Sequence, residues 1–171
     1  SITTGYTDRP LLPSIPNETA TAQASHLFLI EVNGKRLGSG DFTVNRLTTH
    51  SKPMGFEAEL LLLELRMAAT LTAETAGQGR LRLGLRLSNR GETPVQVKTA
   101  FPHIAGLEAD YYLFPYCGGI IADVPTYLRT AYGENTAWWQ MIDVFRPAEG
   151  CGLSVRIEDE AGGYKCPVLR K

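Results

Sequence analysis

The sequence has few of the features that several classes of protein require. Its 171 residues include three cysteines, Cys117, Cys151 and Cys166, an odd number that excludes complete internal pairing. No apolar run approaches the length of a membrane-spanning helix. Lysine and arginine total 17 against 18 aspartate and glutamate residues, which gives a formal net charge of -1 without a long basic run. We therefore expect no membrane span and no nucleic-acid partner.

Motifs for common catalytic and metal sites are also missing. The cysteines are too widely spaced for a CxxC pair, and His26, His50 and His103 do not lie at ligand spacing from one another or from a cysteine. No P-loop, dinucleotide-binding loop or EF-hand occurs. The favoured interpretation of the cysteines is three buried thiols, with one disulfide such as Cys151–Cys166 left open. The sequence predicts no catalytic residues, no metal and no cofactor, and it leaves the compartment open.

The composition itself is that of an ordinary folded domain. Hydrophobic residues make up 43% and charged residues 20% of the chain, which is long enough for one substantial core. Residues 1–25 are rich in Thr, Ser and Pro, and they predict an extended N-terminal arm. We expect residues 26–171 to form a single β-sandwich domain, and we expect the chain to be part of a longer polypeptide because its ends look arbitrary.

Short alternating segments between turn residues predict an all-β fold. Residues 27–32 lead into Asn33-Gly34, a strong hairpin signal, and residues 35–37 resume the strand. Residues 80–87 alternate strictly between leucine, on one face, and mostly arginine on the other, and we expect them to pair with 95–99 as a hairpin. Repeated segments of this kind are typical of an antiparallel β-sandwich.

Residues 56–74 are ambiguous. Their alanine, leucine, glutamate and methionine content favours a helix by intrinsic propensity. The apolar run at 60–63 fits a buried strand equally well, and periodicity does not separate the two. We favour two strands, because the segments that follow are clearly strands.

The most informative segment is 138–145, which contains two adjacent tryptophans. As a strand it would present apolar residues on both faces, which is typical of a strand covered on both sides. One interpretation is therefore a second layer or a partner domain over each face. Another is a carbohydrate contact, in which aromatic rings stack on sugars and polar groups bind hydroxyls. The carbohydrate-contact candidates are Trp138, Trp139, Gln140, Asp143 and Tyr116, although burial of both indoles in the core is the commoner outcome.

The carboxylates offer only a weak metal candidate. Glu158, Asp159 and Glu160 could supply oxygen ligands to a calcium ion. A solvated strand end is the favoured interpretation, because such residues are mostly exposed.

Several segments, taken in order, resemble a known family. They are Ser-Asn-Arg-Gly-Glu-Thr-Pro-Val at 88–95, Phe-Pro-His-Ile-Ala-Gly-Leu at 101–107, Phe-Pro-Tyr-Cys-Gly-Gly at 114–119, Trp-Gln-Met-Ile-Asp-Val-Phe at 139–145, Gly-Leu at 152–153 and Glu-Asp at 158–159. This order resembles the N-terminal β-supersandwich domains, similar to galactose mutarotase, that precede a (β/α)-barrel in large bacterial glycoside hydrolases of the endo-α-N-acetylgalactosaminidase type and related hydrolases.

The resemblance covers roughly residues 80–160 and implies an accessory role. In that family the barrel supplies the catalytic carboxylates, and the sandwich packs against it. The family's sandwich is usually longer, which implies a truncated version here. His103 and Glu158 do not match the mutarotase His and Glu by motif, so mutarotase activity is not carried over.

We therefore expect a non-catalytic accessory β-sandwich domain whose partner is a glycoside hydrolase catalytic domain of the same polypeptide. One alternative is a free-standing carbohydrate-binding module, which requires exposed aromatics among Trp138, Trp139, Tyr111, Tyr112, Tyr116 and Tyr132. A second alternative is a mutarotase-like or lyase-like sugar enzyme, which requires a histidine and a carboxylate in one cleft.

Overall fold

The structure is a computed structural model, and it describes residues 2–4, 26–132, 137, 139–158 and 164–171. The chain divides into two compact units, Ser1–Ala105 (unit 1) and Gly106–Lys171 (unit 2), where the sequence predicts one domain over 26–171. Every regular element in the described ranges is a strand or a three-residue 3-10 helix, which confirms the all-β prediction. Of the predicted arm, only Ile2–Thr4 is described, and it forms a short strand.

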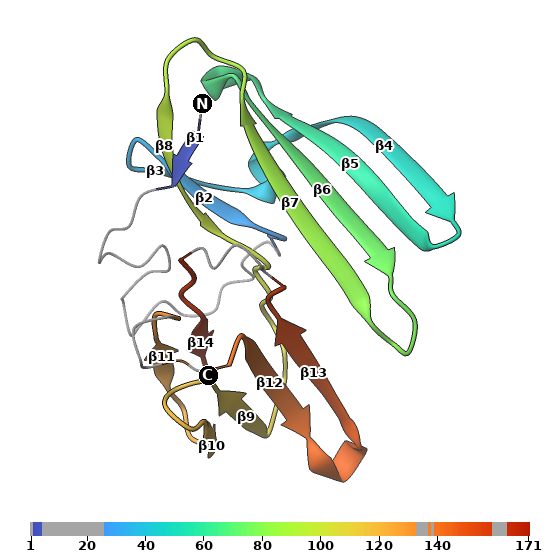
Figure 1. The fold of residues 1–171 in the computed structure, drawn as a ribbon, viewed down its shortest axis with the longest axis vertical. Helices are drawn as coiled ribbons and strands as arrows, with labels where there is room; N and C mark the ends of the chain where they lie inside the picture. Colours follow the sequence, from blue (N-terminus) through green and yellow to red (C-terminus); the bar gives the residue numbers. More distant parts are fainter. Residues whose placement is uncertain (1, 5–25, 133–136, 138, 159–163) are drawn as a thin grey trace. The chain divides into compact units, whose positions relative to one another are not determined.

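Unit 1 contains two four-stranded sheets (Figure 1). Sheet A has the order β1-β8-β2-β3 and sheet B the order β4-β5-β6-β7. All pairings are antiparallel except that of β1 with β8. The strands are β1 (Ile2–Thr4), β2 (Leu29–Val32), β3 (Lys35–Gly38), β4 (Thr43–Ser51), β5 (Met54–Leu62), β6 (Met67–Thr75), β7 (Leu81–Asn89) and β8 (Val95–Ala100).

The turns explain two of these hairpins. Asn33 and Gly34 both have positive φ, 53° and 79°, which is the backbone that a two-residue hairpin of β2 and β3 requires. The ambiguous segment is two strands as favoured: β5 ends in a 3-10 turn at Leu63–Leu65, and Arg66 adopts the left-handed conformation before β6 starts. The helix alternative is thereby excluded.

The predicted hairpin of 80–87 with 95–99 is wrong. β7 pairs along its length with β6 in sheet B, whereas β8 lies between β1 and β2 in sheet A. The connection between them is held by Asn89, whose side chain accepts from the N–H of Gly91 (2.8 Å) and donates to the carbonyl of Thr93 (2.7 Å). This turn carries the chain from one sheet to the other, and alternation within each strand does not reveal such a crossing.

The two sheets of unit 1 enclose one hydrophobic core, so unit 1 is a β-sandwich. Phe28, Ile30, Val32 and Val97 come from sheet A or its entry and are almost fully buried. They pack with Ala58, Leu60, Leu62, Met67 and Ala69 of sheet B. Phe28 and Phe42 meet edge to face, with ring centroids 5.3 Å apart. Burial of this apolar area is the main stabilising contribution to the unit.

Glu31 links three strands of sheet A. It pairs directly with Arg36 on β3 and Lys98 on β8, and its carboxylate accepts from Lys98 Nζ at 2.6 Å and Arg36 Nε at 3.5 Å. The hydrogen bond from Lys98 is the largest cause that lowers the pKa of Glu31, and the charges of Lys98 and Arg36 add to it. The carboxylate is therefore more stable as an anion in the folded protein than in the unfolded chain.

We predict that Glu31→Gln lowers the free energy of unfolding by about 0.5–1 kcal/mol at pH 7. Because the folded-state pKa is depressed, the ionised carboxylate stabilises the fold above the unfolded-state pKa of about 4.3. That stabilisation is lost as the pH falls through the folded-state pKa. The difference in free energy of unfolding between wild type and Glu31→Gln should therefore disappear there. Urea unfolding from pH 7 to pH 3 measures this, with Glu57→Gln, an exposed carboxylate on β5, as control. A gap independent of pH would contradict the prediction.

Unit 2 has a four-stranded antiparallel sheet, sheet C, of order β10-β9-β12-β13, and a separate β11–β14 pair. Its core consists of Tyr112, Phe114 and Leu169, with Leu128, Ile142 and Val144 packed against them. Side chains of sheet C and of the β11–β14 pair thus share one cluster. The strands are β9 (Tyr111–Phe114), β10 (Ile120–Ala122), β11 (Tyr127–Arg129), β12 (Met141–Arg146), β13 (Cys151–Arg156) and β14 (Val168–Arg170).

The three cysteines are free thiols, and the Cys151–Cys166 disulfide is not formed. Cys117 and Cys151 are exposed, so the expectation that the thiols are buried is wrong for both. Both adjoin turns, at Gly118-Gly119 and after Gly150, where little of unit 2 covers them. Across the ranges that the structure describes, no helix is long and apolar enough to span a membrane.

Candidate functional site

The inner face of sheet B carries an exposed apolar surface, which we call the open apolar face. The exposed apolar residues of this face lie beside buried core residues of the same sheet: Val44 pairs with Leu60, and Leu47 pairs with Ala58. Four of the five are at least 60% exposed. In Figure 1 the β4–β5 and β6–β7 hairpin ends extend beyond the strands of sheet A. The open apolar face consists of Val44, Leu47, Met54, Leu81 and Leu83.

The opposite face of sheet B is polar. Arg46 pairs with Glu59, Glu59 with Thr70, and Thr70 with Arg86, all across neighbouring strands. Glu59 accepts hydrogen bonds from Asn45 (2.7 Å) and from Arg90, and these two bonds lower its pKa. Sheet B thus has one solvated face and one largely apolar face, and part of the apolar face is exposed within unit 1.

Strand β4 is the edge of sheet B next to the open apolar face. All nine of its residues are exposed, from Thr43 to Ser51. An edge strand of this length leaves a row of backbone N–H and C=O groups without ladder partners. A contiguous apolar face with such an edge is typical of a protein–protein interaction surface.

Unit 2 presents a second surface, on one side of sheet C, which we call the aromatic face. Phe145 pairs with Tyr111 and stacks on its ring, with centroids 5.7 Å apart. Asp143 pairs with Leu113 two residues along the same strands and therefore lies on the same side. Trp139 precedes β12 at the opposite end of this side. The aromatic face consists of Tyr111, Leu113, Trp139, Asp143 and Phe145, and the register places Met141 and Ile121 on the same side.

The indole of Trp139 is held against the β9–β10 turn. A Cβ at Gly119, whose φ is 98°, would lie 2.9 Å from the indole Cζ3 and 3.3 Å from Leu113 Cδ1. Gly119 therefore leaves the space that the ring occupies. Trp139 is still 43% exposed, and Tyr111 is 38% exposed.

Unpartnered polar atoms collect on and beside β12. Among the described residues, the buried side-chain oxygen and nitrogen atoms without a hydrogen-bond partner are Gln140 Oε1, Asp143 Oδ1 and Arg146 Nε. A buried acceptor without a donor costs about 1–3 kcal/mol, so each such group calls for an explanation.

The residues predicted from sequence to contact carbohydrate lie in different places in the structure. Trp139 and Asp143 lie together on the aromatic face, and Tyr116, 44% exposed, lies in the adjoining turn whose Gly119 contacts Trp139. Gln140 precedes β12 in a bend, and its backbone carbonyl accepts from the N–H of Ile157. Trp138 lies outside the described residues.

The other tyrosine candidates are placed differently. Tyr112 is 3% exposed and belongs to the core of unit 2, so it cannot bind a sugar. Tyr132 lies under the ammonium group of Lys165, 5.2 Å from the ring centroid. Tyr111, by contrast, is exposed and stacked on Phe145, so it adds a second ring to the aromatic face.

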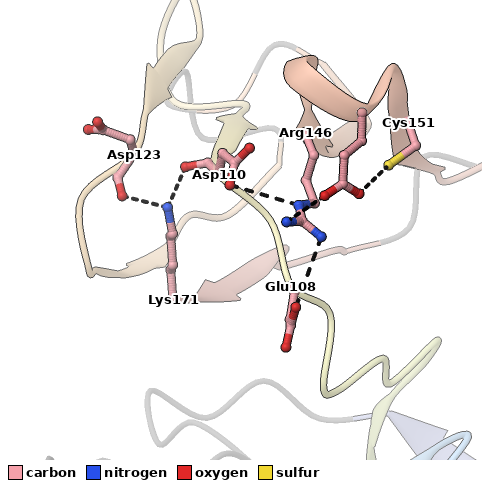
Figure 2. Close-up of polar contacts among 7 residues, drawn as sticks. Glu108, Asp110, Asp123, Arg146, Cys151 and Lys171 are labelled. Atoms are coloured by element: carbon pink, nitrogen blue, oxygen red, sulfur yellow. Dashed lines mark hydrogen bonds and ion pairs between the residues drawn. The ribbon is translucent and has the colours of Figure 1, made fainter.

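A charged network closes the far end of β12 (Figure 2). Arg146 forms ion pairs with Glu149 (2.7 Å), Asp110 (3.9 Å) and Glu108 (4.0 Å). Lys171 donates to the backbone carbonyls of Asp110 and Asp123. Figure 2 shows that these contacts join the segment before β9 to the 3-10 turn after β12. Exposed pairs of this kind tether loops and contribute little stability individually.

The structure gives the histidines local roles. Nδ1 of His103 lies 3.0 Å from the carbonyl oxygen of His26, and Nδ1 of His26 accepts from the N–H of Gly40 at 3.3 Å. His50 lines a surface hollow at the β4–β5 turn, and that hollow contains no carboxylate. A second hollow, beside the β2–β3 turn, contains Glu64 and Glu92 but no histidine. Neither hollow provides the His and carboxylate pair of a mutarotase-like enzyme.

Of the weak calcium candidates, only Glu158 lies among the described residues. Glu158 is exposed, and Asp159 and Glu160 lie outside the described residues. Within the described ranges, no three His, Cys, Asp or Glu side chains form a group that could hold a metal ion.

The fold and surfaces define an all-β protein built on antiparallel sheets, with a sandwich in unit 1 and two exposed surfaces of different chemistry. No family model, no curated protein and no solved structure matches the chain.

Proposed function

We propose that this chain is a non-catalytic accessory β-sandwich domain of a carbohydrate-active enzyme, and that its open apolar face packs against the catalytic domain of the same polypeptide. The observation that carries the proposal is the exposed apolar part of the inner face of sheet B. Val44 and Leu47 on β4 and Met54 on β5 are each at least 60% exposed, although they share a face of sheet B with core residues such as Leu60.

The alternation of the strands in sheet B supports docking through this face. The same face supplies Leu60 and Ala69 to the core of unit 1 and stays apolar along β5 and β7 to Met54 and Leu81, whereas β4 and β6 place Thr49, Ser51 and Thr75 on it. An apolar face that continues past its own second layer suits a partner that completes the layer.

The resemblance of residues 80–160 to accessory supersandwich domains supports the class of partner. In those enzymes the sandwich packs on a (β/α)-barrel hydrolase that carries the catalytic carboxylates. The proposed role of this chain is therefore to stabilise and shape that catalytic domain, without supplying acid or base groups to the reaction.

A charge placed on the open apolar face tests the proposal. Leu47 is 61% exposed, so we predict that Leu47→Lys changes the free energy of unfolding of the isolated chain by less than about 0.5 kcal/mol. In the natural polypeptide the same lysine would be buried at the interface, and we expect the melting temperature of the catalytic domain to fall by several degrees. Differential scanning calorimetry of both forms measures the two effects.

Thr48→Lys is the matched control, because Thr48 is exposed on the same strand and points to the polar face. Thr48→Lys should leave the free energy of unfolding of the isolated chain unchanged. It should also leave the melting temperature of the catalytic domain in the natural polypeptide unchanged. Equal effects of Leu47→Lys and Thr48→Lys on the catalytic domain would refute docking through this face.

A further inference from the structure

A separate surface, the aromatic face of unit 2, has the chemistry of a ligand site. We propose that it binds an oligosaccharide, with sugar rings stacked on Trp139 and on Tyr111 and with Asp143 accepting a hydroxyl hydrogen bond between them. This binding is independent of the docking role of sheet B, since the two surfaces lie in different units.

The register sets the spacing of the groups. β9 and β12 are antiparallel, and Phe145 opposite Tyr111 marks one end of the face. Asp143 opposite Leu113 lies about 7 Å further along, at roughly 3.3 Å per residue. Trp139 lies beyond it, at the end where Gly119 and Leu113 contact the indole. Two exposed aromatic groups thus flank one carboxylate on a sheet surface.

Each aromatic group is held by its neighbours. The Tyr111 ring stacks on Phe145 at an interplanar angle of 18°, which fixes its plane. The indole of Trp139 fits over Gly119, where a side chain would clash with it. Rings that are already oriented lose little conformational entropy when a ligand stacks on them.

Asp143 supplies the polar half of the site. It lies on β12, an inner strand of sheet C; its Oδ1 is buried, whereas its Oδ2 is not among the buried unpartnered atoms and is the oxygen that a ligand hydroxyl can reach. Ser154, its direct partner on β13, is exposed on the same side and can donate to or accept from a second hydroxyl. A sugar combines apolar C–H faces with hydroxyl donors, and it therefore matches both halves of the surface.

The alternative occupant of this face is an apolar protein surface, and the carboxylate argues against it. Docking of an apolar surface over Asp143 would bury its Oδ2 as well and leave that oxygen without a donor. A hydroxylated ligand supplies that donor. The open apolar face of sheet B, in contrast, has no charged residue among its members.

The experiment is isothermal titration of the full chain with soluble tetrasaccharides that have gluco, galacto, manno and xylo backbones. We expect at least one of them to bind, and we expect Trp139→Ala to weaken that binding by about tenfold or more, because it removes a stacking ring. Asp143→Asn, which keeps the shape but removes the charge, should also weaken it severalfold. Trp139→Phe should restore part of the affinity.

Tyr127→Ala is the control, since Tyr127 is a 45% exposed tyrosine on β11, away from the aromatic face. Circular dichroism melts confirm that each variant is folded before titration. Absence of binding by the wild type at millimolar sugar, or binding that Trp139→Ala and Tyr127→Ala change equally, would overturn the proposal. Neither result bears on the docking role of sheet B, which the Leu47→Lys and Thr48→Lys pair tests by itself.

Discussion

Phe28→Ala should lower the free energy of unfolding of unit 1 by about 3–5 kcal/mol, the largest effect expected of any single substitution discussed. Phe28 has no exposed surface and packs edge to face on Phe42 between the two sheets. The substitution removes the favourable burial of the phenyl ring. It also leaves a cavity that the surrounding strands cannot fill. Urea unfolding followed by circular dichroism measures the change.

The neighbouring residue supplies the control for Phe28. Leu27 is 53% exposed, so Leu27→Ala should cost less than about 1 kcal/mol in the same assay. If both substitutions destabilised the protein to the same extent, the core of unit 1 would not be centred on Phe28 as described.

Gly55→Ala should destabilise sheet B by about 1–3 kcal/mol, although it adds a single methyl group. The new Cβ would lie 2.3 Å from the backbone carbonyl oxygen of Ala73 and 2.9 Å from the Cα of Glu74. Both atoms belong to the backbone of β6, which cannot rotate away as a side chain would. The strands β5 and β6 must therefore separate locally, and a lower urea midpoint is the expected result.

Gly40→Ala is the comparison for Gly55. A Cβ at Gly40 would lie 3.4 Å from the ring of His26, an ordinary van der Waals distance, so its midpoint should stay near that of wild type. A Gly55→Ala protein as stable as Gly40→Ala would show that β5 and β6 do not approach as closely as the register requires.

Strand positions were predictable from sequence where local chemistry determines them. Asn33-Gly34 predicts the β2–β3 hairpin because few other residue pairs adopt two positive φ angles in succession. The alternating leucines of β7 likewise predict which face of that strand is apolar. The pairing of β7 with β6, and not with β8, depends on how long-range layers assemble, and it is not encoded in alternation.

The candidate surfaces were predictable only in part. Trp139 and Asp143 were identified because a strand with apolar residues on both sides is unusual, and they do share one side of sheet C. An exposed apolar patch was expected of an accessory domain, but its place on sheet B was missed, because Leu81 and Leu83 look like core residues in the sequence. Alternation shows which face of a strand is apolar, but the length of the opposite sheet decides how much of that face is covered.

The central claim is that a catalytic domain covers the open apolar face of sheet B. Hydrogen–deuterium exchange of the isolated chain and of the natural full-length polypeptide tests it most directly, with the β2–β3 hairpin as an internal reference. The account predicts that peptides from β4 and from the Leu81–Leu83 end of β7 exchange at least about tenfold more slowly in the natural polypeptide, because docking covers them. Equal exchange of these peptides in both forms, or a natural polypeptide that carries no catalytic domain, would contradict it.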